Sequence, residues 1–453
     1  MISYYSTNRR SPEVDLAAAL LQGQAGDKGL FMPRPLPRLD RELLAGARDM
    51  AYPELAAWIL GLYAGGVFSE EELGEICGDA YDFEVPLERV QGQRHLLRLD
   101  RGPTASFKDF AARFMGRALG RLVRARGGEL LVLTATSGDT GSAVAHAFMG
   151  VENVRVVVLF PLDEVSDRQR RQMTTLGGNI ATLGLDAKFD DCQALVKRAF
   201  SDPDLADLGL TSANSINIGR LLPQSVYYVH AAARVADIAG GEHVVFSVPS
   251  GNFGNLMGGL LAMHMGLPVA RFVVATNAND EVPRFLATGR YEKIVPSRKC
   301  ISNAMNVGHP SNLARVIDLY GGWMDEQGEV ERQPDLDRLR QDLFAVSIDD
   351  ERTRRTIVET YRSHGTLLEP HGAVGWAGLE EFVAASPAQA ELPAISLETA
   401  HPAKFPEEIR ALIGIDPELP ESLAGLDARP EHHRRLAPDY LAFKEFLISE
   451  YRV

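Results

Sequence analysis

From residue 95 onward, short runs of β-forming residues alternate with amphipathic segments of helical length. This pattern predicts strands at 95–99, 130–135, 154–160, 180–183, 244–248, 271–275 and 394–397, and helices at 111–123, 141–149, 168–176, 190–200, 255–265 and 281–287. The alternation predicts an α/β fold with parallel twisted sheets covered by helices, because parallel strands are joined through crossover helices. Such sheets bind ligands at the carboxyl ends of their strands, so function is expected in the loops that follow the strands.

The same pattern divides the chain into parts of different character. Residues 1–94 are expected to form a mostly helical N-terminal domain, and 95–235 a smaller α/β domain. Residues 236–415 are expected to form a larger α/β domain, in which the stretch 289–345, punctuated by glycine and proline, is a largely helical insertion. Residues 416–453 are rich in Pro, Glu and Arg and are expected to be a C-terminal tail that ends in a helix at 440–451.

Charge and cysteine usage argue against several classes of protein. The net charge of -14 argues against nucleic acid or acidic membranes as partners. No apolar run approaches the roughly 18 residues that span a bilayer, and the N-terminus lacks the apolar core of a signal peptide. The three cysteines are widely separated, which fits neither a disulfide framework nor a metal site. We therefore expect a cytoplasmic protein that acts on or binds a small molecule, as a monomer or homodimer.

Lys108 lies in the turn between the predicted strand at 95–99 and the predicted helix at 111–123. A helix N-terminus carries partial positive charge, which disfavours the ammonium form and favours an amine nucleophile at this position. A solvated surface lysine is the alternative for any single Lys. The interpretation of Lys108 therefore depends on the other motifs of the chain.

Two loops that follow predicted strands have the composition of anion-binding turns. The first, Thr-Ala-Thr-Ser-Gly-Asp-Thr-Gly-Ser at 134–142, brings hydroxyls and free N–H groups to the start of a helix. The second, Pro-Ser-Gly-Asn-Phe-Gly-Asn at 249–255, has two glycines that let an oxyanion approach consecutive amides. The second loop has neither the Gly-Lys-Ser/Thr of a P-loop nor the glycine spacing of a dinucleotide site. For each loop, an ordinary well-capped turn is the structural alternative.

A lysine at a helix start, a glycine-rich cup and a Ser/Thr turn are together typical of a pyridoxal phosphate enzyme. The lysine would hold the cofactor's aldehyde, the cup its phosphate, and the turn the carboxylate of an amino acid. Two polar segments in apolar surroundings, 214–220 and 399–405, are further candidates for the site. The structural alternatives are a surface charge for Arg220 and a hydrogen-bonded structural histidine for His401.

Several motifs resemble, in the same order along the chain, those of the threonine synthase family of fold-type-II pyridoxal phosphate enzymes. They are Phe-Lys-Asp-Phe at 107–110, Ser-Gly-Asp-Thr-Gly at 137–141, Ser-Gly-Asn-Phe-Gly-Asn at 250–255 and Thr-Ala-His-Pro-Ala-Lys-Phe at 399–405. The resemblance runs from residue 4 to about residue 406. Its N-terminal motifs, such as Gly-Leu-Phe-Met-Pro at 29–33, match the bacterial and fungal branch of the family.

The resemblance implies a role for each matching residue. Lys108 would carry the cofactor and move protons, and Thr399 would face the pyridine nitrogen. The residues that would bind the cofactor's phosphate are Ser250, Gly251, Asn252, Phe253, Gly254 and Asn255. Those that would bind the substrate are Thr136, Ser137 and Thr140 at its carboxylate, and Asn214 and Arg220 at its phosphate. Asp139 stands where many fold-type-II enzymes have an Asn beside the phenolic oxygen, so it is either protonated or turned away.

The reaction that the resemblance implies is the conversion of O-phosphohomoserine and water to threonine and phosphate, with pyridoxal phosphate and without a metal. One alternative is a related lyase that expels phosphate and yields 2-oxobutyrate; product analysis separates the two. Another is a catalytically idle small-molecule sensor on the same fold. Absence of the cofactor's absorbance band, at roughly 400–430 nm, would favour the sensor.

Overall fold

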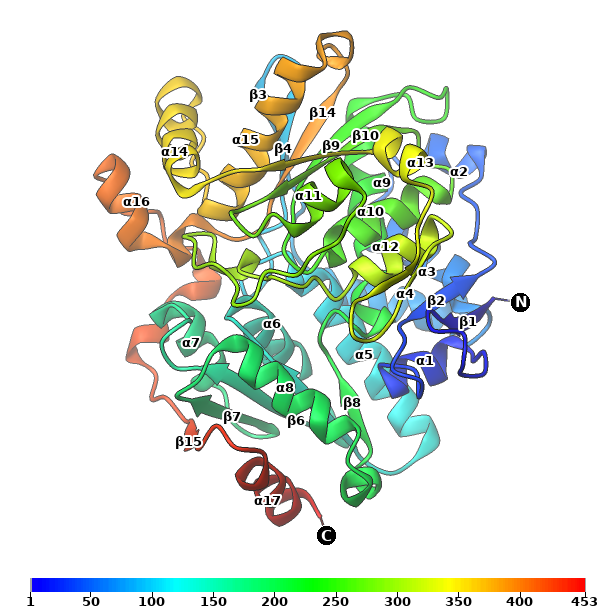
Figure 1. The fold of residues 1–453 in the computed structure, drawn as a ribbon, viewed down its shortest axis with the longest axis vertical. Helices are drawn as coiled ribbons and strands as arrows, with labels where there is room; N and C mark the ends of the chain where they lie inside the picture. Colours follow the sequence, from blue (N-terminus) through cyan, green and yellow to red (C-terminus); the bar gives the residue numbers. More distant parts are fainter. Residues whose placement is uncertain (1, 453) are drawn as a thin grey trace.

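The computed structural model describes residues 2–452, which form two main sheets. The larger sheet lies in the upper half of Figure 1 and the smaller sheet in the lower half. The six strands of the larger sheet are, in spatial order, β13 (Leu343–Ser347), β10 (Val269–Thr276), β9 (Val244–Pro249), β14 (Ala394–Glu398), β4 (Arg94–Arg98) and β3 (Leu87–Gln91). Neighbouring strands are parallel except β3 and β4.

The smaller sheet has five strands, all parallel to their neighbours. Their spatial order is β15 (Arg434–Leu436), β7 (Ile180–Leu185), β6 (Val154–Pro161), β5 (Leu130–Ala135) and β8 (Leu210–Ser212). Strand β5 lies in the interior of the sheet and every one of its residues is buried. The carboxyl end of this buried strand leads directly into the Ser/Thr-rich loop singled out from the sequence.

Alternate residues of the buried strands pack against opposite layers of helices, as the two-residue period of a strand requires. In β5, Leu131 and Leu133 pack in a core shared with α8 (Phe189–Phe200) and α17 (Tyr440–Tyr451). Between them, Val132 packs in the main core, to which α5 (Lys108–Arg126) and α6 (Asp139–Phe148) contribute. The larger sheet is covered in the same way, with α15 (Pro370–Ala385) on β9, β10 and β14. The predicted α/β fold with helix-covered parallel sheets is confirmed.

Most individual elements also lie where the hydrophobic pattern placed them. Strand β5 covers the predicted range, and β6, β7, β9 and β10 differ from their predicted ranges by one or two residues at an end. Of the helices, α17 matches the prediction, and α6, α7 (Asp167–Thr174), α8, α10 (Gly254–His264) and α11 (Glu281–Thr288) begin or end within two residues of it. Helix α9 (Gln224–Val235) links the two sheets and packs on α10.

The N-terminal part combines four helices with an antiparallel pair of strands. The pair is β1 (Ser3–Ser6) with β2 (Phe31–Arg34), and the helices are α1 (Leu16–Gln22), α2 (Arg41–Gly46), α3 (Tyr52–Ala64) and α4 (Glu70–Ala80). Ser69 and Glu72 form a capping box that starts α4, because each side chain accepts from the other's backbone N–H. Strand β3, at the end of this part, belongs to the larger sheet.

Two other regions differ in character from what the sequence suggested. The stretch 289–345, expected to be largely helical, contains two seven-residue helices, α12 (Leu313–Leu319) and α13 (Leu336–Asp342), a hairpin of β11 (Trp323–Met324) and β12 (Val330–Arg332), and much irregular chain. The chain then continues through α14 (Asp350–His364), and α16 (Pro406–Ile413) follows later. The expected C-terminal tail returns to the smaller sheet, where β15 pairs with β7 and α17 packs on α8.

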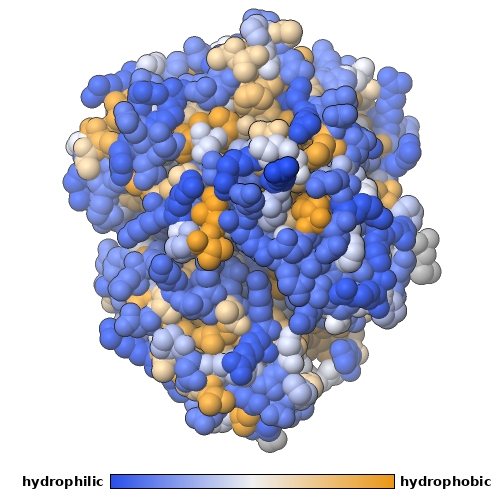
Figure 2. Space-filling view, viewed as in Figure 1, coloured by the Kyte–Doolittle hydropathy of each residue, from blue (hydrophilic) through white to orange (hydrophobic). Residues whose placement is uncertain are grey.

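The exterior is polar and carries no large apolar face on the described part of the chain. Figure 2 shows apolar residues scattered among hydrophilic ones on the face in view. The strongly exposed large apolar side chains are Met149, Val295, Leu419 and Leu441, which come from separate segments. Among residues 2–452, the helices are too short or too polar to cross a bilayer.

Arg315 of α12 ties three segments of the chain together in the interior. Its side chain is fully buried and donates to the carbonyl oxygens of Phe31 (3.1 Å), Ser215 (3.0 Å) and Ile216 (2.7 Å). It also donates to the side chain of Asn312 at 2.6 Å. Burial lowers the pKa of Arg315 to about 9, so the guanidinium is still charged at neutral pH. The insertion thereby holds the loop that contains Asn214 and Arg220 against β2.

We expect Arg315→Met to lower the free energy of unfolding by about 3 kcal/mol, because three buried carbonyl groups lose a charged donor. Urea titration followed by circular dichroism measures this change. Arg410→Met is the matched control: Arg410 forms an exposed ion pair with Asp416, and its removal should cost no more than about 0.5 kcal/mol. Equal stability of the two variants would show that the carbonyl groups find other donors.

Candidate active site

A cavity between the two sheets brings together most of the residues predicted from the sequence. Its lining includes Lys108, Ser137, Asp139, Thr140, Asn214, Arg220, Gly251, Asn252, Phe253, Gly254, Asn255 and Thr399. These residues come from the start of α5 and from loops at the carboxyl ends of β5, β8, β9 and β14. Thr136 and Ser250 are buried and do not line the cavity. The site therefore lies where parallel sheets place their ligands.

Lys108 is the first residue of α5 and its ammonium group reaches into this cavity. The turn before it is anchored to the end of β14, because the N–H of Phe107 donates to the carbonyl of Thr399 at 2.9 Å. Burial lowers the pKa of Lys108 to about 8; the charges of Lys404 and Arg220 act in the same direction, while Asp139 opposes them. An appreciable fraction of Lys108 is thus the neutral, nucleophilic amine near neutral pH.

The surroundings of Asp139 favour its ionised form. Burial alone would raise the pKa of Asp139, but the ammonium groups of Lys404 and Lys108 hold it below its usual range. The nitrogen of Lys404 lies 2.6 Å from Asp139 Oδ1, whereas that of Lys108 lies 3.8 Å from Oδ2. Gln169 donates to Oδ1 as well, at 2.9 Å. Asp139 still lines the cavity, so it is a charged group of the site.

Two hydroxyl residues of the Ser/Thr turn at 134–142 line the cavity, and a third stabilises the turn by hydrogen bonds. Ser137 and Thr140 line the cavity. The hydroxyl of Thr136 accepts from the N–H groups of Gly138 (2.9 Å) and Gly141 (2.8 Å), so it stabilises the turn rather than facing the cavity. The turn as a whole stands at the N-terminus of α6, where backbone and dipole favour an anion.

The glycine-rich loop presents a row of free backbone amides at the start of α10. Phe253 adopts a left-handed conformation with φ of 61° and is buried, which turns the chain sharply before the helix. Within residues 2–452, the N–H groups of Gly251 through Asn255 donate to no backbone or side-chain acceptor. The hydroxyl of Ser250 donates to Asn255 Oδ1 at 3.2 Å and braces the loop from behind. This arrangement is an anion cradle.

Arg220 supplies a second positive charge to the lining of the cavity. It ends the short 3₁₀ turn Ile218–Arg220, is almost fully buried, and donates to the carbonyl of Ala213 at 2.5 Å. Its Nε has no hydrogen-bond partner within residues 2–452. Burial lowers the pKa of Arg220 to about 10, which leaves it cationic. The side-chain amide of neighbouring Asn214 donates to the carbonyl of Ala135 at 2.7 Å and accepts from its N–H at 3.2 Å. These two hydrogen bonds fix the segment that contains Asn214 against the end of β5.

Thr399 follows β14 and lies beside a buried carboxylate. Its hydroxyl is 3.4 Å from Glu369 Oε1, a long contact that leaves the hydroxyl free for a stronger partner. Glu369 in turn accepts from His371 Nδ1 at 2.5 Å, and His371 Nε2 accepts from the N–H of Ala304 at 3.0 Å. Burial and the charge of Glu369 raise the pKa of Glu398 well above its usual range. These contacts orient the wall around Thr399.

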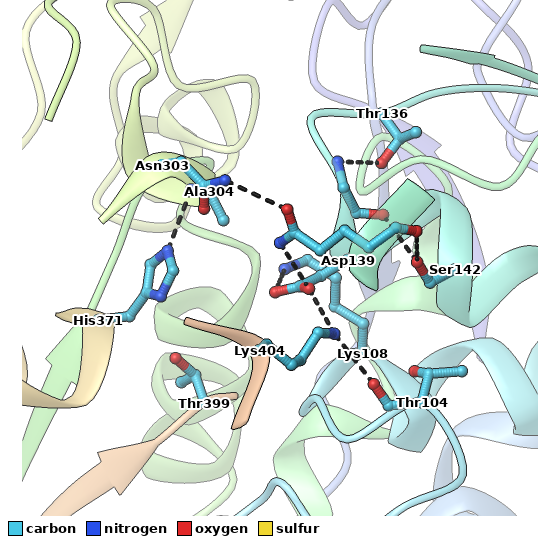
Figure 3. A network of polar contacts seen from close by, with 12 residues as sticks. Thr104, Lys108, Thr136, Asp139, Ser142, Asn303, Ala304, His371, Thr399 and Lys404 are labelled. Atoms are coloured by element: carbon cyan, nitrogen blue, oxygen red, sulfur yellow. Dashed lines mark hydrogen bonds and ion pairs between the residues drawn. The ribbon is translucent and has the colours of Figure 1, made fainter. Parts of the chain in front are cut away.

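Sequence analysis did not assign four polar residues that the fold brings to the site. They are Gln169, Glu369, His371 and Lys404. Figure 3 shows Lys404 between Asp139 and Thr104. It also shows the ring of His371 pointing to Ala304. Glu369 carried a usable signal, since it precedes Pro370 as the cap of α15. Lys404 stood in the motif at 399–405, but its partner Asp139 is remote in sequence. His401, an open question from the sequence, accepts from the N–H of Ala403 and caps a short turn.

The residues present fit pyridoxal phosphate. The free amides of the glycine-rich loop and the helix dipole of α10 suit its phosphate, and the lowered pKa of Lys108 suits a bond to its aldehyde. The hydroxyl of Thr399 suits a ring nitrogen. Together these groups can hold a phosphate-bearing aldehyde and leave Arg220 and the Ser/Thr turn for a second anionic molecule.

We expect Gly251→Ala to weaken the affinity for pyridoxal phosphate by about tenfold, or about 1.4 kcal/mol. The added Cβ would lie 2.8 Å from the Cα of Met305 and 3.0 Å from the carbonyl oxygen of Ala304, both backbone atoms, so the cradle must shift. Fluorescence titration of the cofactor-free chain measures the dissociation constant. Gly74→Ala, where nothing lies within 4 Å of the new Cβ, is the matched control. An unchanged constant for Gly251→Ala would remove this close approach from the cofactor site.

Comparisons with known proteins point to a single family. Three family models match: "Pyridoxal-phosphate dependent enzyme" over residues 85–392, "Threonine synthase N terminus" over 3–81 and "Threonine synthase, C-terminal" over 372–447. The chain is 41% identical to threonine synthase of Haemophilus influenzae, with 99% of this chain and 100% of the relative covered.

Solved structures show the same relationship. The crystal structure of threonine synthase from Escherichia coli superimposes with a TM-score of 0.88 at 39% identity, covering 99% of this chain and 100% of that one. The pyridoxal-phosphate-bound threonine synthase from Brucella melitensis superimposes with a TM-score of 0.91 at 33% identity, covering both chains completely. Because the family models, the curated relatives and the solved structures agree over nearly the whole chain, the chain belongs to the threonine synthase family of pyridoxal-phosphate-dependent enzymes.

Proposed function

We propose that this chain converts O-phosphohomoserine and water to threonine and phosphate through the cavity around Lys108. The observation that carries the proposal is that Lys108, a mostly buried lysine, lines the same cavity as a cradle of free amides and the cationic side chain of Arg220. A substrate with a carboxylate at one end and a phosphate at the other needs two anion sites besides that of the cofactor. The Ser/Thr turn and Arg220 supply them.

Bound at the amide cradle, pyridoxal phosphate supplies an electron sink for negative charge at the substrate's α-carbon. The chain's residues would bind, orient and move protons around it. Ser137 and Thr140 would hold the substrate's carboxylate by their hydroxyls and the adjacent N–H groups at the start of α6. The guanidinium of Arg220 would hold the phosphate ester, since its Nε is unpartnered within residues 2–452 and the side chain is already desolvated.

Lys108 would move the protons of the reaction. With a pKa of about 8, its amine can accept protons from the α-carbon and the β-carbon in successive steps. It can return one proton to the γ-carbon after phosphate has left and one to the α-carbon after water has added. Among the lysines of the site, Lys404 cannot replace it, because its ammonium is held by Asp139 at 2.6 Å and by the carbonyl of Thr104 at 3.0 Å. The departing phosphate, still beside Arg220, is the candidate base for the water that adds at the β-carbon.

Water must be excluded until elimination is complete, and one contact supports such a closure. Asn303, from the segment over the cavity, donates to Gln169 Oε1 of the smaller sheet's helix α7 at 3.2 Å. The same segment donates to His371 through the N–H of Ala304. The segment therefore bridges the two halves of the molecule above the reacting groups, where it would keep bulk water out.

Product analysis tests the proposal. The loaded enzyme given O-phosphohomoserine should release threonine and phosphate in equal amounts, measured by chromatography and a phosphate assay. Phosphate with an equal amount of 2-oxobutyrate would instead establish the lyase. A purified chain that binds no cofactor, and so has no band at roughly 400–430 nm, would contradict the proposal and favour the sensor.

The proposal extends to the setting of the enzyme. The negative net charge and the three free, buried cysteines support a cytoplasmic enzyme of small molecules without a nucleic acid partner, acting as a monomer or homodimer. We also propose functional domains at 1–94, 95–235 and 236–415, with 416–453 as an appendage that completes the smaller sheet. Light scattering of the purified chain separates monomer from homodimer.

A further inference from the structure

Lys404 is a fully buried lysine that the reaction above does not use. It lies in the short turn Pro402–Lys404 after β14, and its side chain has no exposed surface. Its ammonium group makes an ion pair with Asp139 Oδ1 at 2.6 Å and donates to the carbonyl of Thr104 at 3.0 Å. Thr104 lies in the turn that leads into Lys108. Its N–H and hydroxyl both donate to Asp109, the residue that follows Lys108. Lys404 thus connects Asp139 to the turn that carries the reactive lysine (Figure 3).

Two lysines compete for one carboxylate at this point. Lys404 holds Asp139 at ion-pair distance, while Lys108 stands 3.8 Å from the other carboxylate oxygen. Gln169 holds the same oxygen as Lys404 at 2.9 Å, so the carboxylate is clamped on the side away from Lys108. A buried carboxylate without Lys404 would turn to the remaining ammonium, because a buried charge without a partner is costly.

We propose that Lys404 is a positioning residue that holds Asp139 away from Lys108, so that Lys108 is not captured in a tight ion pair and keeps its reactive amine available. The inference rests on the proposed function of Lys108. Its physical basis has two parts that act in the same direction. Lys404 repels a second ammonium group nearby, and it occupies the carboxylate that would otherwise stabilise the charge on Lys108.

The other charged groups around this pair do not duplicate Lys404. Those that act on Lys108 besides Asp139 and Lys404 are Arg220 and Glu369, and His371 acts on Asp139. Glu369 is engaged by His371 at 2.5 Å, and Arg220 donates to the carbonyl of Ala213. Asp109 is satisfied by Thr104. Lys404 is therefore the cation whose ion pair with Asp139 competes with an ion pair between Asp139 and Lys108.

The pKa of Lys108 in the full-length, cofactor-free chain tests the proposal directly. Trace labelling of amines with isotopic acetic anhydride at a series of pH values, followed by mass spectrometry of the Lys108 peptide, measures it. Lys404→Met should raise this pKa by about one unit or more, so that labelling of Lys108 below its pKa falls by about tenfold. Lys404→Gln, which keeps a hydrogen-bond donor without charge, should act in the same direction and serves if the Met variant does not fold.

A double-variant cycle shows whether Lys404 acts through Asp139. In an Asp139→Asn background the carboxylate is absent, so adding Lys404→Met should shift the pKa of Lys108 by less than half as much. Lys444→Met, at a surface pair with Asp202 and Asp204 remote from the site, is the control and should shift nothing. No shift with Lys404→Met, or equal shifts in both backgrounds, would overturn the proposal.

This outcome is independent of the proposed reaction. Product analysis of the unchanged enzyme decides whether the chain makes threonine, whereas amine labelling reads the charge of Lys108 without substrate. The cycle can therefore fail while threonine is made, and it can succeed in an enzyme that makes 2-oxobutyrate.

Discussion

Lys108→Ala is expected to lower kcat/KM by about 10⁴-fold or more, the largest effect of any single substitution in this chain. Lys108 is the amine with a lowered pKa in the cavity, and both the bond to the cofactor and the proton transfers are assigned to it. Lys404 cannot take over, since Asp139 and Thr104 hold its ammonium group at 2.6 and 3.0 Å. Threonine formation from O-phosphohomoserine, assayed with added pyridoxal phosphate, measures the loss.

Chemical mapping provides the complementary result for Lys108. Borohydride reduction of the loaded wild-type enzyme, followed by peptide mapping, should place the cofactor on Lys108. Lys444→Ala, which removes a surface lysine, serves as the matched control and should keep full activity. A reduced adduct on Lys404, or on no lysine, would contradict the assignment of Lys108.

Arg220→Ala is expected to lower kcat/KM by about 100- to 1,000-fold while the bound cofactor is retained, as for the loss of a charge-assisted contact to phosphate. The guanidinium is buried, cationic, and unpartnered at Nε within residues 2–452, and these are the properties of a side chain that awaits an anion. The free amides that suit the cofactor's phosphate belong to a different segment, at the start of α10. Steady-state kinetics and the visible spectrum of the same preparation measure both parts of the prediction.

Arg220→Lys distinguishes charge from geometry at this wall. Lysine keeps the positive charge but cannot make two parallel hydrogen bonds, so its loss should be intermediate between wild type and Arg220→Ala. Loss of the cofactor's band with an unchanged KM for O-phosphohomoserine would show that Arg220 serves the cofactor's phosphate instead. The assignments of the two phosphate sites would then have to be exchanged.

The elements of the fold were predictable because their signals are local. The residues of β5 alternate between two cores, and their run of buried apolar side chains is visible in the sequence before any neighbour is known. The Ser/Thr turn and the glycine-rich loop directly follow such strands, so their place at one edge of the sheets follows from the parallel topology. The resemblance of motifs then pointed to the family, which the comparisons confirm.

Regions without a local signal were described less well. The strand β15 has three residues, two of them exposed, and joins the smaller sheet only because β7 offers an unpaired edge. The stretch 289–345 has little regular helix and is fixed in place by long-range hydrogen bonds. Arg315 alone donates to the carbonyl groups of Phe31, Ser215 and Ile216. Partners this far apart along the chain leave no periodic pattern that a reading of the sequence could detect.

The sequence by itself determined which residue types stand at the ends of the strands, and hence that Lys108, a cradle of amides and a Ser/Thr turn face one cavity. Only the tertiary structure decided how these groups are charged and oriented. Thr136 and Ser250 turn inward to brace their own loops, and Asp139 is ionised because Lys404 lies 2.6 Å away. A hydrophobic pattern repeats along the chain, but the charge of a buried group depends on its distance to partners that folding alone brings near.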